Sequence, residues 1–160
     1  MEEKKKNTHE FKMVHMYEAD ISTSEKPIIG TDALATCVGV LLYNETKKQA
    51  IVAHVAPEQF DIIDQIIKLL VENNWISDNI KYKIIPGYYK EHYNTKETLE
   101  EYFSIFERID DSKLSENDIM TNEEYTCRAF AFDSRIGQFI TDKVYFGEDY
   151  YKIISSKRKK

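Results

Sequence analysis

Two apolar runs separated by a short polar segment restrict the fold of this chain more than any other feature. The first run is LATCVGVLLYN (34–44), the second is AIVAHVA (50–56), and NETKKQ (44–49) lies between them. Continuous Val- and Leu-rich runs of this length are typical of strands buried on both faces, and a short polar connection favours an antiparallel hairpin. We therefore predict a buried β-hairpin over residues 34–56.

Helical patterns follow the hairpin. The segment 57–74 has Ile and Leu residues at helical spacing, and Pro57 suits the first turn of a helix, where its missing N–H is not needed. A second amphipathic helix is predicted at 94–109, where Asn94 and Glu97 have the spacing of a capping pair.

The remaining segments complete an α+β pattern. Further strands are predicted at 9–22, 80–85, 125–133 and 138–146, with turns or connections at 23–32, 110–124 and 133–137. This order predicts an α+β fold with mixed, largely antiparallel β-sheet layers and two amphipathic helices packed on them.

Composition excludes several classes of protein. The net charge of −6 argues against nucleic-acid binding, which needs a basic surface. No apolar run approaches the roughly 18 residues of a membrane span, so we expect no membrane insertion. Two cysteines are too few for a disulfide framework, and no Cys/His spacing resembles a zinc site, so we expect neither a metal nor a cofactor.

The length of 160 residues suits a single domain, 1–160, with no linker that would divide it. Its basic ends, about residues 1–10 and 155–160, are predicted to be flexible and solvated. Because no apolar stretch follows the charged N-terminus, a secretory signal is not expected, and we predict a cytoplasmic location.

The predicted hairpin brings together one of two cysteines and one of four histidines. A loop centred between Glu45 and Thr46 places Cys37 directly opposite His54, with Cβ atoms about 4.5 to 5.5 Å apart. A histidine at this distance can take the proton of a thiol and return it to a leaving group. For a cysteine or a histidine considered alone, packing in the core is the commoner role. The cross-strand placement of the two makes a catalytic pair, with Cys37 as nucleophile and His54 as base, an equal alternative.

A histidine base usually needs a hydrogen-bond acceptor on its second ring nitrogen. Thr31, Asp32 and Thr36 are the nearby candidates, and the residues alone do not choose between them. Cys127 lies in an aromatic strand without a histidine nearby in sequence, so we predict that it is a core residue.

The segments TDALATCVGV and AIVAHV resemble the signature of the CheD-type chemoreceptor glutamine deamidases. That family has a threonine six residues before a cysteine, in the pattern T-x-x-L-x-[ST]-C-V-x-V, and a histidine seventeen residues after it. Thr31, Cys37 and His54 match both spacings.

Weaker similarity to this family extends over about residues 12–142, with Lys83, Arg128 and Gly137 in corresponding places. The glycines of the family's GLGSC segment are Ala33 and Ala35 here. Because substrate choice depends on the loops around a site, the resemblance leaves the substrate protein open: a chemoreceptor or another protein.

The resemblance implies a bacterial protein-glutamine deamidase, an amidohydrolase that converts glutamine side chains to glutamate through a thioester. Cys37 would be the nucleophile, His54 the base and Thr31 the residue that orients the histidine. We expect Thr36, Tyr88 and Tyr89 to contact the substrate. The expected partners are a protein that carries the target glutamine and a regulatory signalling protein.

Two alternatives remain open at this point. One is a non-catalytic signalling adaptor of the same fold, in which Cys37 and His54 are core residues. The other is an effector exported to a host cell without a Sec signal, where it deamidates or transglutaminates host proteins. An exposed thiol of low pKa beside an imidazole would favour an enzyme, whereas a buried neutral thiol far from His54 would favour the adaptor.

Overall fold

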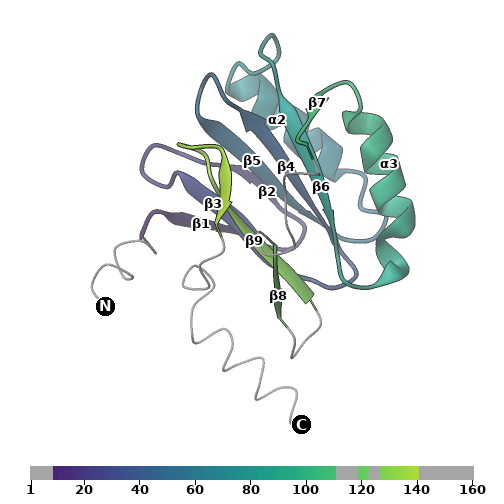
Figure 1. The fold of residues 1–160 in the computed structure, drawn as a ribbon. Coiled ribbons are helices and arrows are strands. Elements are labelled where there is room, and N and C mark those ends of the chain that lie inside the picture. Colours follow the sequence, from purple (N-terminus) through teal and green to yellow (C-terminus); the bar gives the residue numbers. More distant parts are fainter. Residues whose placement is uncertain (1–8, 111–118, 123–126, 141–160) are drawn as a thin grey trace.

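A computed structural model describes residues 9–110, 119–122 and 127–140, and the structural statements below concern these residues. The chain forms three layers: two helices, a five-stranded sheet packed against them, and a second five-stranded sheet on the opposite face of the first (Figure 1). Both sheets are mixed and mostly antiparallel, which confirms the predicted α+β class.

The sheet next to the helices is built around the predicted hairpin. Its strand order is β2-β5-β4-β6-β7. The strands are β2 (Ala19–Ile21), β5 (Gln49–Val55), β4 (Val38–Asn44), β6 (Lys81–Pro86) and β7 (Glu107–Arg108). Strand β4 is buried along its whole length, because it is central and covered on both faces.

The second sheet has the order β1-β3-β9-β10, and β8 also pairs with β9. Its strands are β1 (Phe11–Val14), β3 (Ile28–Leu34), β8 (Met120–Asn122), β9 (Cys127–Asp133) and β10 (Gln138–Ile140). Strand β1 runs parallel to β3, and the other pairs are antiparallel.

Two predictions for the N-terminal third are wrong. The segment 9–22 is not one strand, because the chain turns at Tyr17 (φ 72°) and contributes β1 to one sheet and β2 to the other. The segment 23–32, predicted as a turn, contains most of β3. Gly30 lies within β3, where it is needed because the backbone of Phe130 in β9 leaves no room for a Cβ atom.

Both predicted helices exist, with different bounds: the second was predicted to reach residue 109 but ends at Phe103, and Glu107–Arg108 form β7. Helix α2 (Ile62–Glu72) begins after Pro57, because Glu58 has a positive φ of 60° and the segment before the helix forms turns. A 3₁₀ turn, η1 (Lys90–His92), leads into α3 (Tyr93–Phe103). No side chain caps α3, so the predicted capping pair of Asn94 and Glu97 is wrong.

The C-terminal predictions are partly confirmed. Strand β9 and the hairpin to β10 are present, and Gly137 has the positive φ of 66° that this turn requires. The predicted connection 110–124 contains β8. The residues beyond Ile140, and the termini predicted to be flexible apart from His9 and Glu10, lie outside the described residues.

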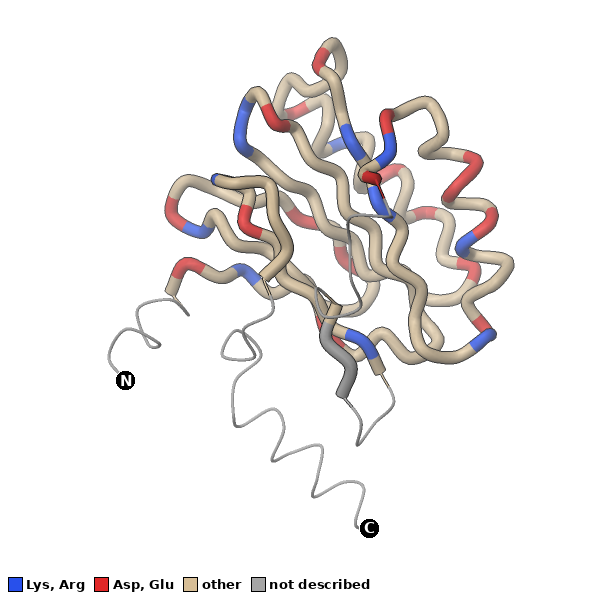
Figure 2. Tube along the Cα trace, in the orientation of Figure 1, with Lys and Arg blue, Asp and Glu red and all other residues tan. Residues whose placement is uncertain are grey.

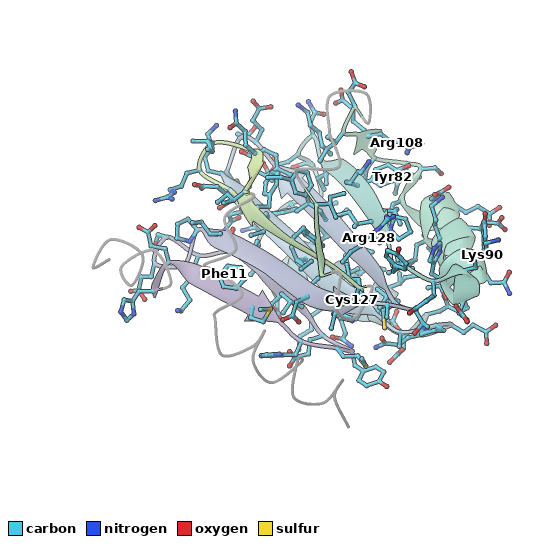
Figure 3. All side chains as sticks on the ribbon, turned by 60° about the horizontal axis from the view of Figure 1, so that its bottom comes forward. Phe11, Tyr82, Lys90, Arg108, Cys127 and Arg128 are labelled. Carbon is cyan, nitrogen blue, oxygen red and sulfur yellow. The ribbon has the colours of Figure 1, made fainter. Side chains whose placement is uncertain are left out.

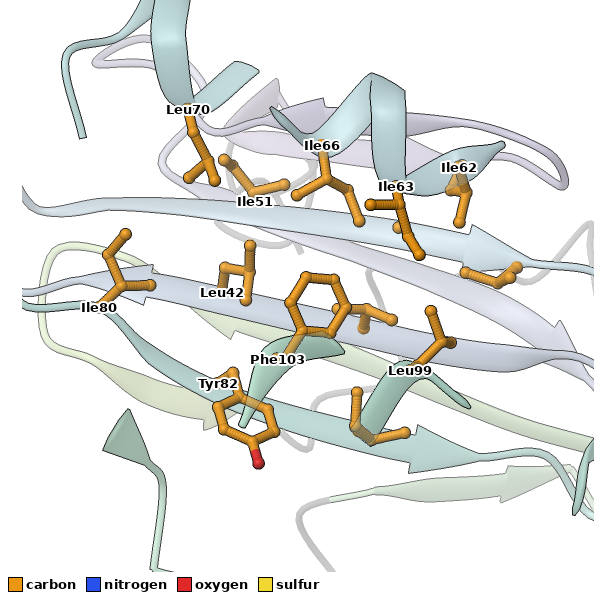
Figure 4. Packing of buried hydrophobic residues seen from close by; sticks show 14 of the residues in the cluster. Leu42, Ile51, Ile62, Ile63, Ile66, Leu70, Ile80, Tyr82, Leu99 and Phe103 are labelled. Carbon is orange, nitrogen blue, oxygen red and sulfur yellow. The ribbon is translucent and has the colours of Figure 1, made fainter. Parts of the chain in front are cut away.

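Two apolar layers hold the sheets and helices together. Figure 4 shows Ile62, Ile63, Ile66 and Leu70 of α2 above the strands, with Leu99 and Phe103 of α3 beside them. The opposite face of the same strands packs on the second sheet through a separate cluster that includes Leu41, Val52, Phe130 and Phe132. Thr31, Cys37 and His54 belong to this second layer, between the two sheets, whereas Tyr88 and Tyr89 are exposed.

Charged residues lie mainly on helices, turns and strand ends, and the central strands in Figure 2 are mostly tan. Within the described ranges, no helix is long and apolar enough to cross a membrane. The same residues contain no group of three or more His, Cys, Asp or Glu side chains that could hold a metal ion.

Candidate active site

A buried hydrogen bond joins the two sheets at one end of the molecule. The Oγ1 atom of Thr31 in β3 lies 2.7 Å from Nδ1 of His54, near the end of β5. Both side chains are within the layer between the sheets, and both residues are almost fully buried. The pairing of Thr31 with His54 implied by the family resemblance is therefore present as a contact.

The hydrogen bonds of Thr31 define which nitrogen of His54 carries the proton. The Thr31 hydroxyl donates its one hydrogen to the carbonyl oxygen of Val14, 2.7 Å away. Its oxygen is then left to accept a hydrogen bond from Nδ1–H of His54. This arrangement favours the tautomer in which Nε2 has no proton and is free to act as a base.

The second ring nitrogen of His54 is unsatisfied. Nε2 is buried and has no hydrogen-bond partner among the described residues. Burial and, to a smaller extent, the charge of the nearby His15 together lower the pKa of His54 from 6.5 to about 4. The imidazole is therefore neutral near pH 7, in the form that accepts a proton.

The predicted register of the hairpin is wrong. Gly39, not Cys37, pairs with His54, because the loop comprises 45–48 and is centred one residue later than expected. Asn44 stays at the end of β4, where its side chain accepts a hydrogen bond from the Lys47 amide and donates one to Asp78. The shift moves each partner by two residues, which keeps Cys37 on the face of the hairpin that carries His54.

Cys37 lies at the corner between β3 and β4, just before Val38 begins the strand. It is 4% exposed and packs in the layer between the sheets. Burial raises the pKa of its thiol, and a hydrogen bond from the Thr36 side chain partly offsets this rise. No hydrogen bond joins Cys37 to Nε2 of His54. The thiol is therefore neutral and not ion-paired with the imidazole in the free protein.

A β-bulge in β3 shapes this corner. Pairing with β9 is irregular between Thr31 and Leu34, and Ala33 has a left-handed φ of 57°. In a regular strand, residues three apart point to opposite faces, but the bulge directs both Thr31 and Leu34 into the layer between the sheets. The bulge thus positions Thr31 for His54 while the chain turns toward Cys37.

The turn after β6 is hydrogen-bonded to the corner between β3 and β4 that contains Cys37. The Tyr88 and Tyr89 amides donate to the carbonyl oxygens of Leu34 and Ala35, at 3.0 and 2.8 Å. The α-carbon of Gly87 faces the carbonyls of Ala35 and Cys37 so closely that a Cβ atom would lie 2.5 Å from the Ala35 oxygen.

Arg128 attaches the same turn to the second sheet. Its Nη1 atom donates to the Pro86 carbonyl at 3.3 Å, from the inner face of β9. Figure 3 shows the side chains of Arg128 and Cys127 on opposite sides of this strand, which places Cys127 away from the site. Cys127 is buried, as predicted for a core residue.

The structure selects among the residues considered for the site. Thr31 is the partner of His54, whereas Asp32 interacts electrostatically with His15, and its pKa is raised by burial. Thr36 hydrogen-bonds Cys37. Sequence reasoning missed Val14, which acts through its backbone oxygen and so leaves no side-chain signal. It also missed Gly87, whose backbone packs against the carbonyl groups of Ala35 and Cys37.

Comparison of the chain with protein-family models and with curated protein sequences finds no match.

Proposed function

We propose that this protein is a cysteine-dependent protein-glutamine deamidase, with Cys37 as nucleophile, His54 as base and Thr31 as the residue that orients it. The proposal joins the spacing of these three residues, which resembles the CheD-type deamidases, to the site between the sheets. The substrate would be a glutamine side chain of a protein, either a chemoreceptor or another target.

One observation carries the proposal: His54 is fixed by Thr31 through Nδ1 while its buried Nε2 has no partner. A histidine buried for packing alone would be expected to satisfy both nitrogens, since an unpaired buried polar group costs about 1–3 kcal/mol. An unpaired base in the same buried layer as a cysteine is understandable if the nitrogen serves a reaction.

The proposed reaction begins with a neutral pair. Nε2 of His54 takes the proton of Cys37 as the sulfur attacks the carboxamide carbon of glutamine, which forms a C–S bond and a tetrahedral oxyanion. The low pKa of His54 and the raised pKa of Cys37 favour this general-base route over a preformed thiolate–imidazolium pair. The proton on Nε2 then passes to the departing ammonia as the C–N bond breaks, leaving a thioester.

The second half of the reaction releases the product. Nε2 removes a proton from water, the hydroxide oxygen attacks the thioester carbon, and the C–S bond breaks with return of the proton to Cys37. The protein glutamine has then become glutamate. Throughout both steps, the hydrogen bond between Nδ1–H and Thr31 would stabilise the positive charge that forms on the ring.

Mass spectrometry of candidate proteins incubated with the enzyme tests the proposal. We expect glutamine-to-glutamate conversion and ammonia release with the wild-type protein, and neither with Cys37→Ser or His54→Gln. Cys127→Ser is the matched control, because that cysteine is also buried but points away from the site. Conversion that survives in Cys37→Ser would exclude Cys37 as the nucleophile.

A non-catalytic adaptor is the second candidate, and the state of Cys37 favours it. The thiol is buried, its pKa is raised and it does not hydrogen-bond His54. An adaptor would bind its signalling partner equally well after Cys37→Ser and would release no ammonia. Retained binding together with absent conversion would therefore support the adaptor.

A further inference from the structure

We propose that the Gly87–Tyr89 turn is a gate over Cys37, opened when a glutamine-bearing protein docks on the exposed rings of Tyr88 and Tyr89. This inference rests on the proposed function, and it concerns how that site is regulated. Two observations support the proposal: both reacting groups are buried, and the turn is hydrogen-bonded to the corner that contains the nucleophile.

Neither reacting group is accessible in the free protein. Cys37 is 4% exposed and His54 is 2% exposed, and Nε2 is fully covered. A glutamine on the surface of another protein must bring its carboxamide carbon into contact with the Cys37 sulfur. Part of the structure around Cys37 must therefore move before a protein substrate can react.

The Gly87–Tyr89 turn is the segment whose movement would shift Cys37. Two backbone hydrogen bonds connect it to Leu34 and Ala35, and Gly87 packs directly against the carbonyl oxygen of Cys37. On its outer side, the turn carries two tyrosine side chains that are partly exposed to solvent. Displacing the turn would remove these contacts from the corner.

The two tyrosines offer a surface by which a protein could displace the turn. Tyr88 and Tyr89 are 46% and 44% exposed, and their rings meet edge to face at 5.6 Å. Exposed tyrosines provide large apolar contact area with a polar tip and are enriched at the centres of protein interfaces. Their backbone amides donate hydrogen bonds to the corner, so a partner can bind the exposed parts of the rings while these hydrogen bonds are still made.

The rate at which iodoacetamide alkylates Cys37, followed by peptide mass mapping, reports opening of the gate in the absence of substrate. We expect slow labelling in the wild-type protein and at least tenfold faster labelling in Gly87→Ala, because the added methyl group cannot fit against Ala35 and Cys37. Gly137→Ala is the matched control: its Cβ atom would also clash, 2.9 Å from the Tyr43 ring, but at the far end of the sheets. It should leave the labelling rate of Cys37 unchanged.

A second pair of variants distinguishes the effect of the backbone hydrogen bonds from that of the tyrosine rings. Tyr89→Pro removes the amide that donates to Ala35 and should accelerate labelling, whereas Tyr89→Ala keeps the amide and should not. Thermal unfolding of each variant shows that it is folded. Equal labelling rates in wild type, Gly87→Ala and Tyr89→Pro would overturn the gate, as would wild-type labelling as fast as that of a free cysteine.

Docking is tested on a protein whose conversion depends on Cys37. Replacing both tyrosines by alanine should lower kcat/KM for that protein at least tenfold while the labelling rate of Cys37 stays unchanged. Unaltered kcat/KM would overturn the docking role. Failure of every candidate protein to be converted would count against the proposed function, whereas the labelling experiments judge the gate separately.

Discussion

Gly39 lies directly opposite His54 across the β4–β5 hairpin, so no side chain from β4 stands against the imidazole at that position. The space above Gly39 is filled from the second sheet and the bulge. A Cβ atom on Gly39 would lie 2.8 Å from the Phe130 ring and 3.1 Å from a methyl group of Leu34. The glycine thus lets the two sheets approach closely beside the histidine.

Gly39→Ala should destabilise the protein, because the Phe130 ring would have to shift within a packed layer. We expect a loss of about 1–3 kcal/mol in the free energy of unfolding, the usual cost of overpacking a core. Urea denaturation followed by circular dichroism measures this change. An unaltered midpoint would mean that the two sheets are not packed as closely here as the contacts indicate.

Thr31→Val should remove the acceptor for Nδ1–H of His54 while keeping the shape of the side chain. The buried N–H would lose its partner, so we expect a destabilisation of about 1–3 kcal/mol and loss of the single tautomer. Nitrogen chemical shifts of the imidazole report the tautomer, and Thr31→Ser should restore it. A valine variant with an unchanged tautomer would contradict the orienting role of Thr31.

Stability should fall in acid because of His54. Its pKa is about 4 in the folded protein and 6.5 ordinarily, so between these values only the unfolded chain binds the proton. The wild type should therefore lose about 3 kcal/mol more than His54→Gln as the pH falls from 7 to 4. Urea denaturation at both pH values measures the difference. Parallel losses in the two proteins would show that His54 titrates normally.

Thr36→Ala should make Cys37 a weaker nucleophile toward iodoacetamide. The Thr36 side chain hydrogen-bonds the sulfur and lowers its pKa, in opposition to burial. Without this hydrogen bond, the pKa of the thiol should rise further, and labelling at pH 8 should be about three- to tenfold slower. Thr36→Ser should label like the wild type. Equal rates for the alanine and serine variants would exclude this contact.

Helices and strands whose buried residues recur at a regular spacing were predictable from the sequence. Helix α2, the β4–β5 hairpin, β6 and β9 show this regularity, because each meets the core along one face or along its whole length. Strand β3 was missed because Pro27 and Gly30 resemble turn residues, and the reason for Gly30 is the backbone of a distant strand. Such contacts between strands that are distant in the sequence leave no local pattern.

In the candidate site, the contact between Thr31 and His54 was predictable from the sequence, and the placement of Cys37 opposite His54 was not. The spacing of Thr31, Cys37 and His54 selected the residues, and the Thr31–His54 contact agrees with it. The prediction that Cys37 lies directly opposite His54 was wrong, because the register of the hairpin depends on which residues form its loop. The side chain of Asn44 stabilises the observed loop through its hydrogen bonds to Lys47 and to Asp78. Asp78 lies 34 residues away in sequence.

Ala33→Gly should stabilise the protein. Ala33 has a φ of 57°, in a region that costs a residue with a side chain about 1–2 kcal/mol, and glycine avoids this strain while losing about 0.5–1 kcal/mol of conformational entropy. The expected gain is about 0.5–1 kcal/mol, measured by urea denaturation. Ala35→Gly is the matched control: Ala35 is two residues along the same corner and has no positive φ, so glycine there should destabilise. A loss of stability in Ala33→Gly would mean that the bulge, and with it the direction of Thr31, depends on the alanine side chain rather than on the backbone.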